Sequence, residues 1–294
     1  MQSSGDLAAN PGGTLDNTDG TIDTTRRAAL TAARIDNVRG QMLASSATDD
    51  SALTVNATAL NNQGGVIGTR GGDAVLNVID IDNRSGGRLV ADRDLTLNST
   101  TVDNSGGTTF ANRNLSSENG TGRLTNAGGQ FGAGENARLT LANISNTGNG
   151  LIQAGKVWLN TPNLDLSGNG KVVGNEVHAQ LATLTGDGSL YGTQWLDVDF
   201  SGDYTYGTGP ALARDVLLDL AVAGTFTNVG TLQTPGELAL RATSIINEGA
   251  INASNADGGG YAHITAGSIE NRRGASIEGD WVELKDNVVN NTRD

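Results

Sequence analysis

The chain has 294 residues, a formal net charge of −13 and no cysteine. Without cysteine it cannot form disulfides, a Cys-ligated zinc site or a catalytic thiolate, and its negative charge disfavours nucleic acid and anionic membrane surfaces as partners. It has no apolar run of about 18 residues, so we expect no membrane insertion. The many Gly, Asn, Thr and Asp residues favour short strands joined by turns.

A degenerate motif recurs from one end of the chain to the other. It starts as LDNTDGTI at 15–22 and reads VDNSGGTTF at 102–110. The interval between successive copies varies around an average of roughly 21 residues, and such a period is typical of a solenoid. The third motif position is Asn in most copies and Gly in the others: Asn17, Asn37, Asn62, Asn83, Asn104, Asn126, Asn146, Gly168, Gly186, Gly202, Asn228, Asn247, Asn271 and Asn290.

The segments between the motifs read as strands. Runs such as LTLNSTTV (95–102), KVWLN (156–160) and WVELK (281–285) alternate with period two and are too short and Gly-interrupted for helices. The pattern of a leucine-rich repeat is absent. We therefore predict an all-β fold, a right-handed parallel β-helix of about fourteen coils of roughly 21 residues. Stacked at about 4.8 Å, these coils give a rod of roughly 65–70 Å.

Each motif residue has an expected role. Asn tolerates the left-handed backbone of a sharp bend, and the following Gly supplies positive φ at low cost. Stacked amides can donate to one coil and accept from the next, which predicts a ladder. The apolar residue two places before the Asn should point inward. We expect the ladder to comprise Asn17, Asn37, Asn62, Asn83, Asn104, Asn126, Asn146, Asn228, Asn247 and Asn271.

The chain reads as one domain, 1–294, in three parts: regular coils at 1–161, variant coils at 162–225 and regular coils at 226–294. Gly replaces the motif Asn in the variant part, so the ladder should break there, and the coils are shorter before one long interval. Aromatic residues also gather there. They indicate either a core filled by larger side chains or a partner-binding patch. For the patch, the candidates are Tyr191, Trp195, Tyr204 and Tyr206.

Two insertions interrupt the repeat, at Gln41–Thr54 and at Asn252–Tyr261. A solenoid extrudes insertions from one face, so we expect both to be surface loops.

The pattern carries no constellation for chemistry. His178 and His263 are four coils apart in alternating runs, which favours structural or surface roles. Asp197 and Asp199 should face outward together, with no His or Lys joining them, although carbohydrate-active enzymes of this fold cluster carboxylates on adjacent coils. Partial calcium motifs at 71–78 and 257–260 are not repeated. We expect no enzyme, cofactor or metal.

The serial pattern resembles the repeats of filamentous haemagglutinin. More specifically, it is similar to the repeat stalk of contact-dependent growth inhibition exoproteins, on the segment FSGDYTYGTGPALARDVLLDLAVAGTFTNVGTLQTPGELALRA at 200–242. The similarity covers residues 5–292. The resemblance implies export by two-partner secretion through an outer-membrane transporter and display at the surface of a Gram-negative cell. It also implies a target-cell receptor and a toxin, which neighbouring regions of a larger chain would bind or carry.

On this interpretation the sequence is a stalk segment that holds other parts away from the cell. The alternative is that the segment itself binds a receptor or a glycan. We expect no secretion signal or toxin within it, and bare strand edges at its two ends predict end-to-end association of the isolated segment.

Overall fold

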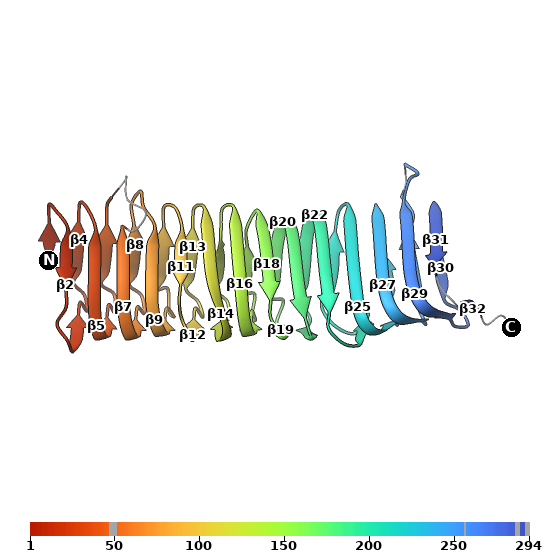
Figure 1. The fold of residues 1–294 in the computed structure, drawn as a ribbon, viewed down its shortest axis with the longest axis horizontal. Coiled ribbons are helices and arrows are strands. Elements are labelled where there is room, and N and C mark those ends of the chain that lie inside the picture. The colour runs from red at the N-terminus through yellow and green to blue at the C-terminus, as the bar shows by residue number, and fades with distance from the viewer. Residues whose placement is uncertain (47–51, 256, 286–288, 292–294) are drawn as a thin grey trace.

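The computed structural model describes residues 1–46, 52–255, 257–285 and 289–291. These residues form one elongated stack of parallel strands, with the N-terminus and the C-terminus at opposite ends (Figure 1). The stack has about 13 turns, and no helix, hence none that could span a membrane, occurs in the described part of the chain. The predicted all-β parallel solenoid is confirmed.

Each turn contributes a short strand to each of three faces, and every strand pairs with its counterpart one turn away. The first face contains β1 (Gln2–Ser3), β4 (Thr21–Thr24), β6 (Gln41–Ala44), β8 (Val66–Thr69), β10 (Arg88–Ala91), β13 (Thr108–Ala111), β15 (Gln130–Ala133), β17 (Leu151–Gln153), β24 (Ala211–Arg214), β26 (Thr231–Gln233), β28 (Ala250–Ala253) and β30 (Ser276–Gly279). The second face contains β2 (Leu7–Ala9), β11 (Leu95–Leu97), β18 (Lys156–Asn160) and β31 (Trp281–Lys285). The third contains β3 (Thr14–Asp16), β12 (Thr101–Asp103), β19 (Asn163–Leu166), β21 (Thr183–Gly186), β23 (Tyr204–Tyr206) and β32 (Val289–Asn291).

Ten longer strands continue around a corner and serve two faces. Two of them, β20 (Lys171–Leu181) and β22 (Ser189–Phe200), cover the first and second faces. The others cover the second and third faces: β5 (Ala28–Asp36), β7 (Leu53–Asn61), β9 (Ala74–Asp82), β14 (Asn114–Thr125), β16 (Asn136–Ser145), β25 (Leu217–Asn228), β27 (Glu237–Asn247) and β29 (Tyr261–Asn271).

The core is a set of apolar columns that run along the axis. Ile81, Val102, Leu124 and Ile144 pair in register from turn to turn and are each at most 4 % exposed. Burying one such side chain stabilises the fold by about 1.5–3 kcal/mol. The alternating sequence places the intervening residues outward, so each turn adds the same inner surface to the stack.

The register of the third face corrects the alignment of the variant coils. Asn146 is matched by Leu166, Leu166 by Gly186, and Tyr206 by Asn228. The expected positions Gly168 and Gly202 are therefore wrong, whereas Gly186 holds the Asn position. From Asn146 to Tyr206 these positions are evenly spaced, so the coils there are not shortened. An apolar or aromatic residue at the Asn position hid this register from the sequence motif.

The last copy of the motif needs the same correction. Asn271 pairs with Asn291, not Asn290, because Ile269 pairs with Val289. Of the two expected insertions, Gln41–Thr54 includes residues 47–51 and Asn252–Tyr261 includes residue 256, and those six residues lie outside the described part of the chain.

Candidate functional site

The buried asparagines form two hydrogen-bonded ladders along the axis. From Asn17 to Asn146, each Nδ2 donates to the Oδ1 of the next asparagine at 2.7 Å. A second ladder runs from Asn228 through Asn247 to Asn271 at 2.8 and 2.7 Å. The rungs from Asn37 to Asn146 are 0 % exposed. The structure thus brings together all ten asparagines proposed for the ladder, in two separate runs.

Each amide also donates to backbone carbonyl groups at the turn. Asn104 Nδ2 lies 3.3 Å from the carbonyl of Gly107 in its own turn and 2.9 Å from that of Gln130 in the next. A backbone bond from Gly107 N to Asn104 O closes the same turn at 2.9 Å. The amide therefore adds a second donor to the Gly107 carbonyl, which also accepts the backbone N–H of Gln130 at 2.9 Å, and it links the corner of one turn to the next.

The bend itself differs from the sequence expectation. The ladder asparagines do not have positive φ; in the first ladder the left-handed residue lies two places later, as Asp19, Arg39 or Gly106. The glycine three places after the asparagine is required for space. A Cβ on Gly107 would lie 2.0 Å from the carbonyl oxygen of Asn83 and 2.9 Å from Oδ1 of Asn104. In most turns of the first ladder the motif is thus Asn-x-x-Gly, and after Asn83 and Asn146 one more residue precedes the glycine that lies against the ladder.

Tyr206 takes over one function of the missing rungs. The ladder stops where Asn146 donates to the carbonyl of Lys171 at 2.8 Å. Tyr206 holds the Asn position before Asn228, and its hydroxyl donates to the carbonyl of Thr231 at 3.3 Å. Asn228 donates to Ala250, which pairs with Thr231. The Tyr206 hydroxyl therefore donates to the carbonyl group that the amide of an asparagine at this position would bind.

Tyr204, a second candidate for partner binding, is a core residue. It is 8 % exposed, and its ring stacks on Phe200 at 3.8 Å between centroids, with Phe226 at 6.3 Å on the next turn. Burial raises the pKa of its hydroxyl well above the usual range. The proposal that Tyr204 contacts a partner is wrong, because its ring fills the interior where the asparagines are missing.

The other two aromatic candidates lie at the surface but not together. Tyr191 donates its hydroxyl to Asp215 at 2.7 Å from the first face. Trp195 is 37 % exposed on the second face, where its ring meets that of His178 edge-on at 5.3 Å. The four aromatic candidates therefore do not form one patch. Tyr204 lies in the core, Tyr206 at the corner, and the other two on different faces.

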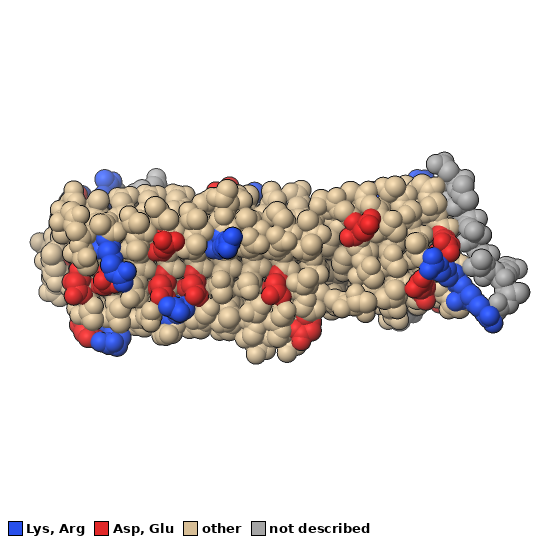
Figure 2. Space-filling view, turned by 90° about the horizontal axis from the view of Figure 1, so that it is seen from below, with Lys and Arg blue, Asp and Glu red and all other residues tan. Residues whose placement is uncertain are grey.

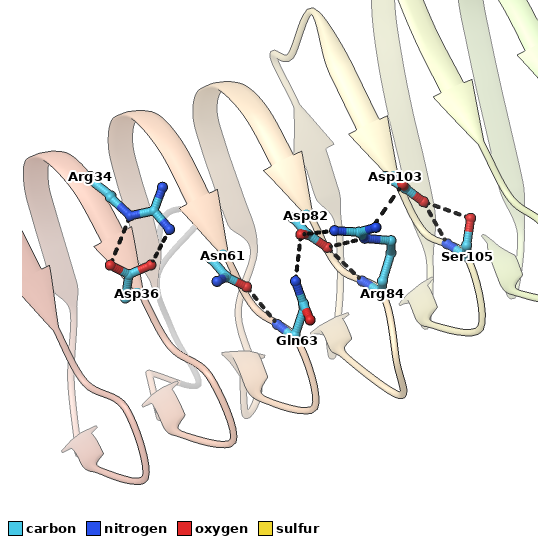
Figure 3. A network of polar contacts seen from close by, with 8 residues as sticks. All are labelled: Arg34, Asp36, Asn61, Gln63, Asp82, Arg84, Asp103 and Ser105. Carbon is cyan, nitrogen blue, oxygen red and sulfur yellow. Dashed lines mark hydrogen bonds and ion pairs between the residues drawn. The ribbon is translucent and has the colours of Figure 1, made fainter.

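A column of carboxylates runs outside the first ladder. The residue before each ladder asparagine points outward. In the first five turns of the ladder these residues pair in register from turn to turn, and they are Asp16, Asp36, Asn61, Asp82 and Asp103. In several turns its oxygen accepts the backbone N–H two residues on; Asp82 accepts from Arg84 N at 3.2 Å and Asp103 from Ser105 N at 3.0 Å (Figure 3). The sequence shows this as Asp before Asn, a signal that the motif analysis did not use.

Arginine side chains compensate the stacked charge. Arg34 binds Asp36 with two hydrogen bonds of 2.8 and 2.6 Å, and Arg84 binds Asp82 in the same way while lying 3.6 Å from Asp103 (Figure 3). The Arg84 hydrogen bonds hold the pKa of Asp82 below its usual value. Figure 2 shows acidic and basic side chains interspersed along one side of the rod, mostly over its N-terminal half. Every carboxylate drawn in Figure 3 is engaged by a neighbouring donor, as in a supporting network.

The second face carries an outward row that sequence reasoning did not assemble. Arg138, Trp158, His178 and Asp197 pair in register on consecutive turns. The guanidinium of Arg138 lies 4.2 Å from the Trp158 ring centre, and Trp158 stacks on His178 at 5.8 Å. His178 Nδ1 lies 3.0 Å from Asp197 Oδ2. The expectation that no His joins the carboxylates is wrong, because parallel pairing puts residues of successive turns side by side.

Groups of three or more His, Asp or Glu side chains placed to hold a metal ion do not occur among the described residues. His263, the other histidine, pairs with Glu283 through Nδ1 at 2.9 Å. The arrangement therefore offers stacking, charge pairing and hydrogen bonding, and both described histidines are engaged with carboxylates.

Comparison with known proteins gives one result. A family model described as Haemagglutinin repeat matches residues 3–52, 44–80 and 163–272. The comparisons with curated proteins and with solved structures found no match. The family matches include most of the variant coils as well as the first asparagine turns.

Proposed function

The chain belongs to the haemagglutinin repeat family, and from this membership we propose that it is a non-enzymatic stalk segment of a large secreted adhesin. The observation that supports this role is the uninterrupted parallel stack of about 13 turns. At about 4.8 Å for each turn, the rod is about 60 Å long. A rigid filament segment of this kind sets the distance between a cell surface and whatever the filament presents.

The asparagine ladder and the carboxylate network suit this role. Both run parallel to the axis and connect neighbouring turns, the ladder from Asn17 to Asn146 and from Asn228 to Asn271, so bending the rod there requires breaking hydrogen bonds in several turns together. The repeated unit needs no ligand to bury its polar corner. A structure whose polar groups satisfy one another is suited to length and stiffness.

We further propose that the protein is exported by two-partner secretion and acts in contact-dependent growth inhibition. On this proposal, an outer-membrane transporter recognises another region of the full-length protein, a target-cell receptor binds its distal part, and a toxin is delivered. The support is the resemblance of residues 200–242 to those exoproteins. A chain without cysteine can also cross the periplasm without disulfides.

The test uses the full-length protein in its own cells. Removing the segment from Asn62 to Asp103, which is two whole turns, keeps the register of the remaining stack and shortens the rod by about 10 Å. We expect export and surface display to persist, with a filament shorter by that length in electron micrographs. Co-culture would then compare how strongly cells with the shortened and the parent protein inhibit the growth of neighbouring cells, once equal export of the two proteins has been checked. Loss of display after a register-preserving deletion would contradict a stalk role.

A further inference from the structure

Three adjacent cavities lie along the outer surface of the second face and its corner with the third. Their volumes are about 240, 340 and 660 Å³, and Asp199 lines all three. Together they extend from Glu118 to Gly267 and cross the strands β14 to β29. We call this surface the axial trench. It runs along the rod, at right angles to the strands.

The sequence of the trench explains why it is hollow. In the first cavity, the outward row from Arg138 to Asp197 forms one wall, and the row containing Asn160, Gln180 and Asp199 forms the other. In the other two cavities the outward positions beside Asp199 are small, including Ala182, Ala223 and Gly267. Long side chains next to small ones leave a depression over several turns.

The polar groups of the trench are rich in hydrogen-bond acceptors but nearly balanced in charge. Asp197 faces His178, and Asp219 binds Arg241 at 2.6 Å. Asp199 has no ion-pair partner among the described residues. Its burial, with Asp197 and Asp219 nearby, raises the pKa of its carboxyl. A half-buried carboxylate without a direct ion pair therefore lies where the three cavities meet, and the charge of Arg241, which lines the third cavity, favours its ionised form.

We propose that the axial trench binds an uncharged, hydroxyl-rich oligosaccharide, with Asp199 as the central hydrogen-bond acceptor. The hydroxyl groups of a sugar are donors that a carboxylate and the side-chain carbonyl groups of Asn160 and Gln180 can accept. The half-buried Trp158 contributes the edge of its ring to the wall, because Arg138 and His178 stack against the ring from the two neighbouring turns. A linear glycan along the trench would pass one outward side chain of each row in every turn, at about 4.8 Å.

The same features disfavour other ligands. An anionic polymer would meet Glu118, Asp197 and Asp199. A peptide strand added to a sheet edge would need free backbone groups, but the strands that form the floor already pair on both sides, as β20 does with β18 and β22. A cationic peptide would have to compete with His178 for Asp197 and with Arg241 for Asp219. Glycan binding is independent of the stalk role, because the rod keeps its length with an empty trench.

The experiment measures binding to the purified 294-residue chain by isothermal titration calorimetry. The probes are cellohexaose, chitohexaose and mannohexaose, with hexagalacturonate and hexalysine as charged comparisons. We expect at least one uncharged hexasaccharide to bind, and Asp199→Asn to weaken that binding by about tenfold or more, because hydrogen bonds to a charged group are lost. Replacing a desolvated carboxylate by an amide should not unfold the chain, which circular dichroism checks.

Two further variants make the result decisive. Ala223→Tyr fills the trench floor and should also weaken binding, whereas Glu248→Gln, which removes a charge paired with Arg272 away from the trench, should leave binding unchanged. The proposal is overturned if no uncharged hexasaccharide binds at millimolar concentration, if Asp199→Asn binds as well as the parent chain, or if hexalysine or hexagalacturonate binds more tightly than the neutral probes.

Discussion

The turns from Asn17 to Asn146 and the turns from Leu166 to Tyr206 build the same corner with different chemistry. The first set joins its corners by buried amides, each bonded to the next at 2.7 Å. The second set places a leucine, a glycine and a tyrosine at the same position, and in its last turn the stacked rings of Phe200 and Tyr204 fill the interior. Parallel pairing of the second-face strands continues through both sets. The corner therefore forms with several side chains, including Leu166 and Gly186, which have no hydrogen-bond donor, and Tyr206, which donates to a carbonyl group.

Arg214 adds a second difference between the two regions. It is 8 % exposed in β24, and its guanidinium donates to the carbonyl groups of Leu212 and Gln233. Burial lowers its pKa. The matching position one turn earlier is Gly192, where a Cβ would lie 2.2 Å from the carbonyl oxygen of Trp195, so a side chain like that of Arg214 does not fit there. A charged side chain thus serves buried carbonyl groups close to the turn where the amide ladder is absent.

The largest effect should come from removing the aromatic core of the middle turns. Tyr204→Ala leaves a cavity between Phe200 and Phe226, and we expect the free energy of unfolding to fall by about 4 kcal/mol. Urea titration followed by circular dichroism measures it. Trp195→Ala, at a 37 % exposed ring, should cost about 1 kcal/mol or less. Equal losses in the two variants would contradict the burial difference between them.

The amide ladder can be tested against a matched surface ladder. Asn104→Ala removes the Oδ1 that accepts from Asn83 and the Nδ2 that donates to Asn126 in a buried corner, although Asn83 still donates to the carbonyl of Thr108, and we expect a loss of about 3 kcal/mol. Asn98 donates to Asn77 at the same 2.7 Å, but both are exposed. Asn98→Ala should therefore cost less than about 0.5 kcal/mol in the same urea titration. If the two losses are similar, burial is not what makes the inner ladder stabilising.

A smaller effect should distinguish the tyrosine substitute from an amide rung. Tyr206→Phe keeps the ring but removes the donor to Thr231, and we expect a loss of about 1 kcal/mol. Tyr191→Phe removes a hydroxyl bonded to Asp215 at the surface and serves as the control, with almost no expected loss. Thermal unfolding of the two variants gives the comparison. A Tyr206→Phe variant as stable as the parent would show that the Thr231 carbonyl needs no side-chain donor.

The smallest effects concern pH, and the two regions should respond with opposite sign. The pKa of Asp82 is lowered from 3.8, mainly by Arg84, so its stabilising contribution is present above pH 3.8 and is lost as the pH falls through the lower folded value. The pKa of Asp199 is raised by burial, so its ionised form destabilises the fold above its raised value, and this cost disappears on acidification.

Asp82→Asn and Asp199→Asn measure these contributions directly. Compared with the parent, Asp82→Asn should be less stable at pH 7 and Asp199→Asn more stable, and both differences should shrink as the pH approaches 3 in urea titrations. A destabilised Asp199→Asn variant at pH 7 would mean that this carboxylate is held by a favourable partner.

Much of the fold could be predicted because it follows from local regularities. The regular repeat period, the alternation of inward and outward residues and the Asn-Gly corners all predict a parallel solenoid, and this prediction is confirmed. The middle turns could not be aligned correctly from the motif, because Leu166 and Tyr206 share no chemistry with asparagine. Only the backbone pairing shows that they occupy its place.

The candidate surface site was less predictable. His178 and Asp197 belong to neighbouring turns, and Asp199 and Arg241 are separated by two turns, so their proximity depends on register across turns. Tyr204 and Tyr206 are next-but-one neighbours, which in a strand predicts one shared face, yet the first fills the core and the second reaches the corner. Exposure in a solenoid depends on where the corner falls.

The sequence by itself determined the repeat, the strand alternation and the positions of the asparagines, because each is a property of neighbouring residues and of their spacing. The tertiary structure alone decided where the left-handed residue lies, which side chains replace the missing amides, and how Trp158, His178 and Asp199 line one trench. Those features depend on which residues of successive turns lie side by side. Parallel pairing of the strands sets that register. The sequence repeat does not specify it, because the number of residues per turn varies.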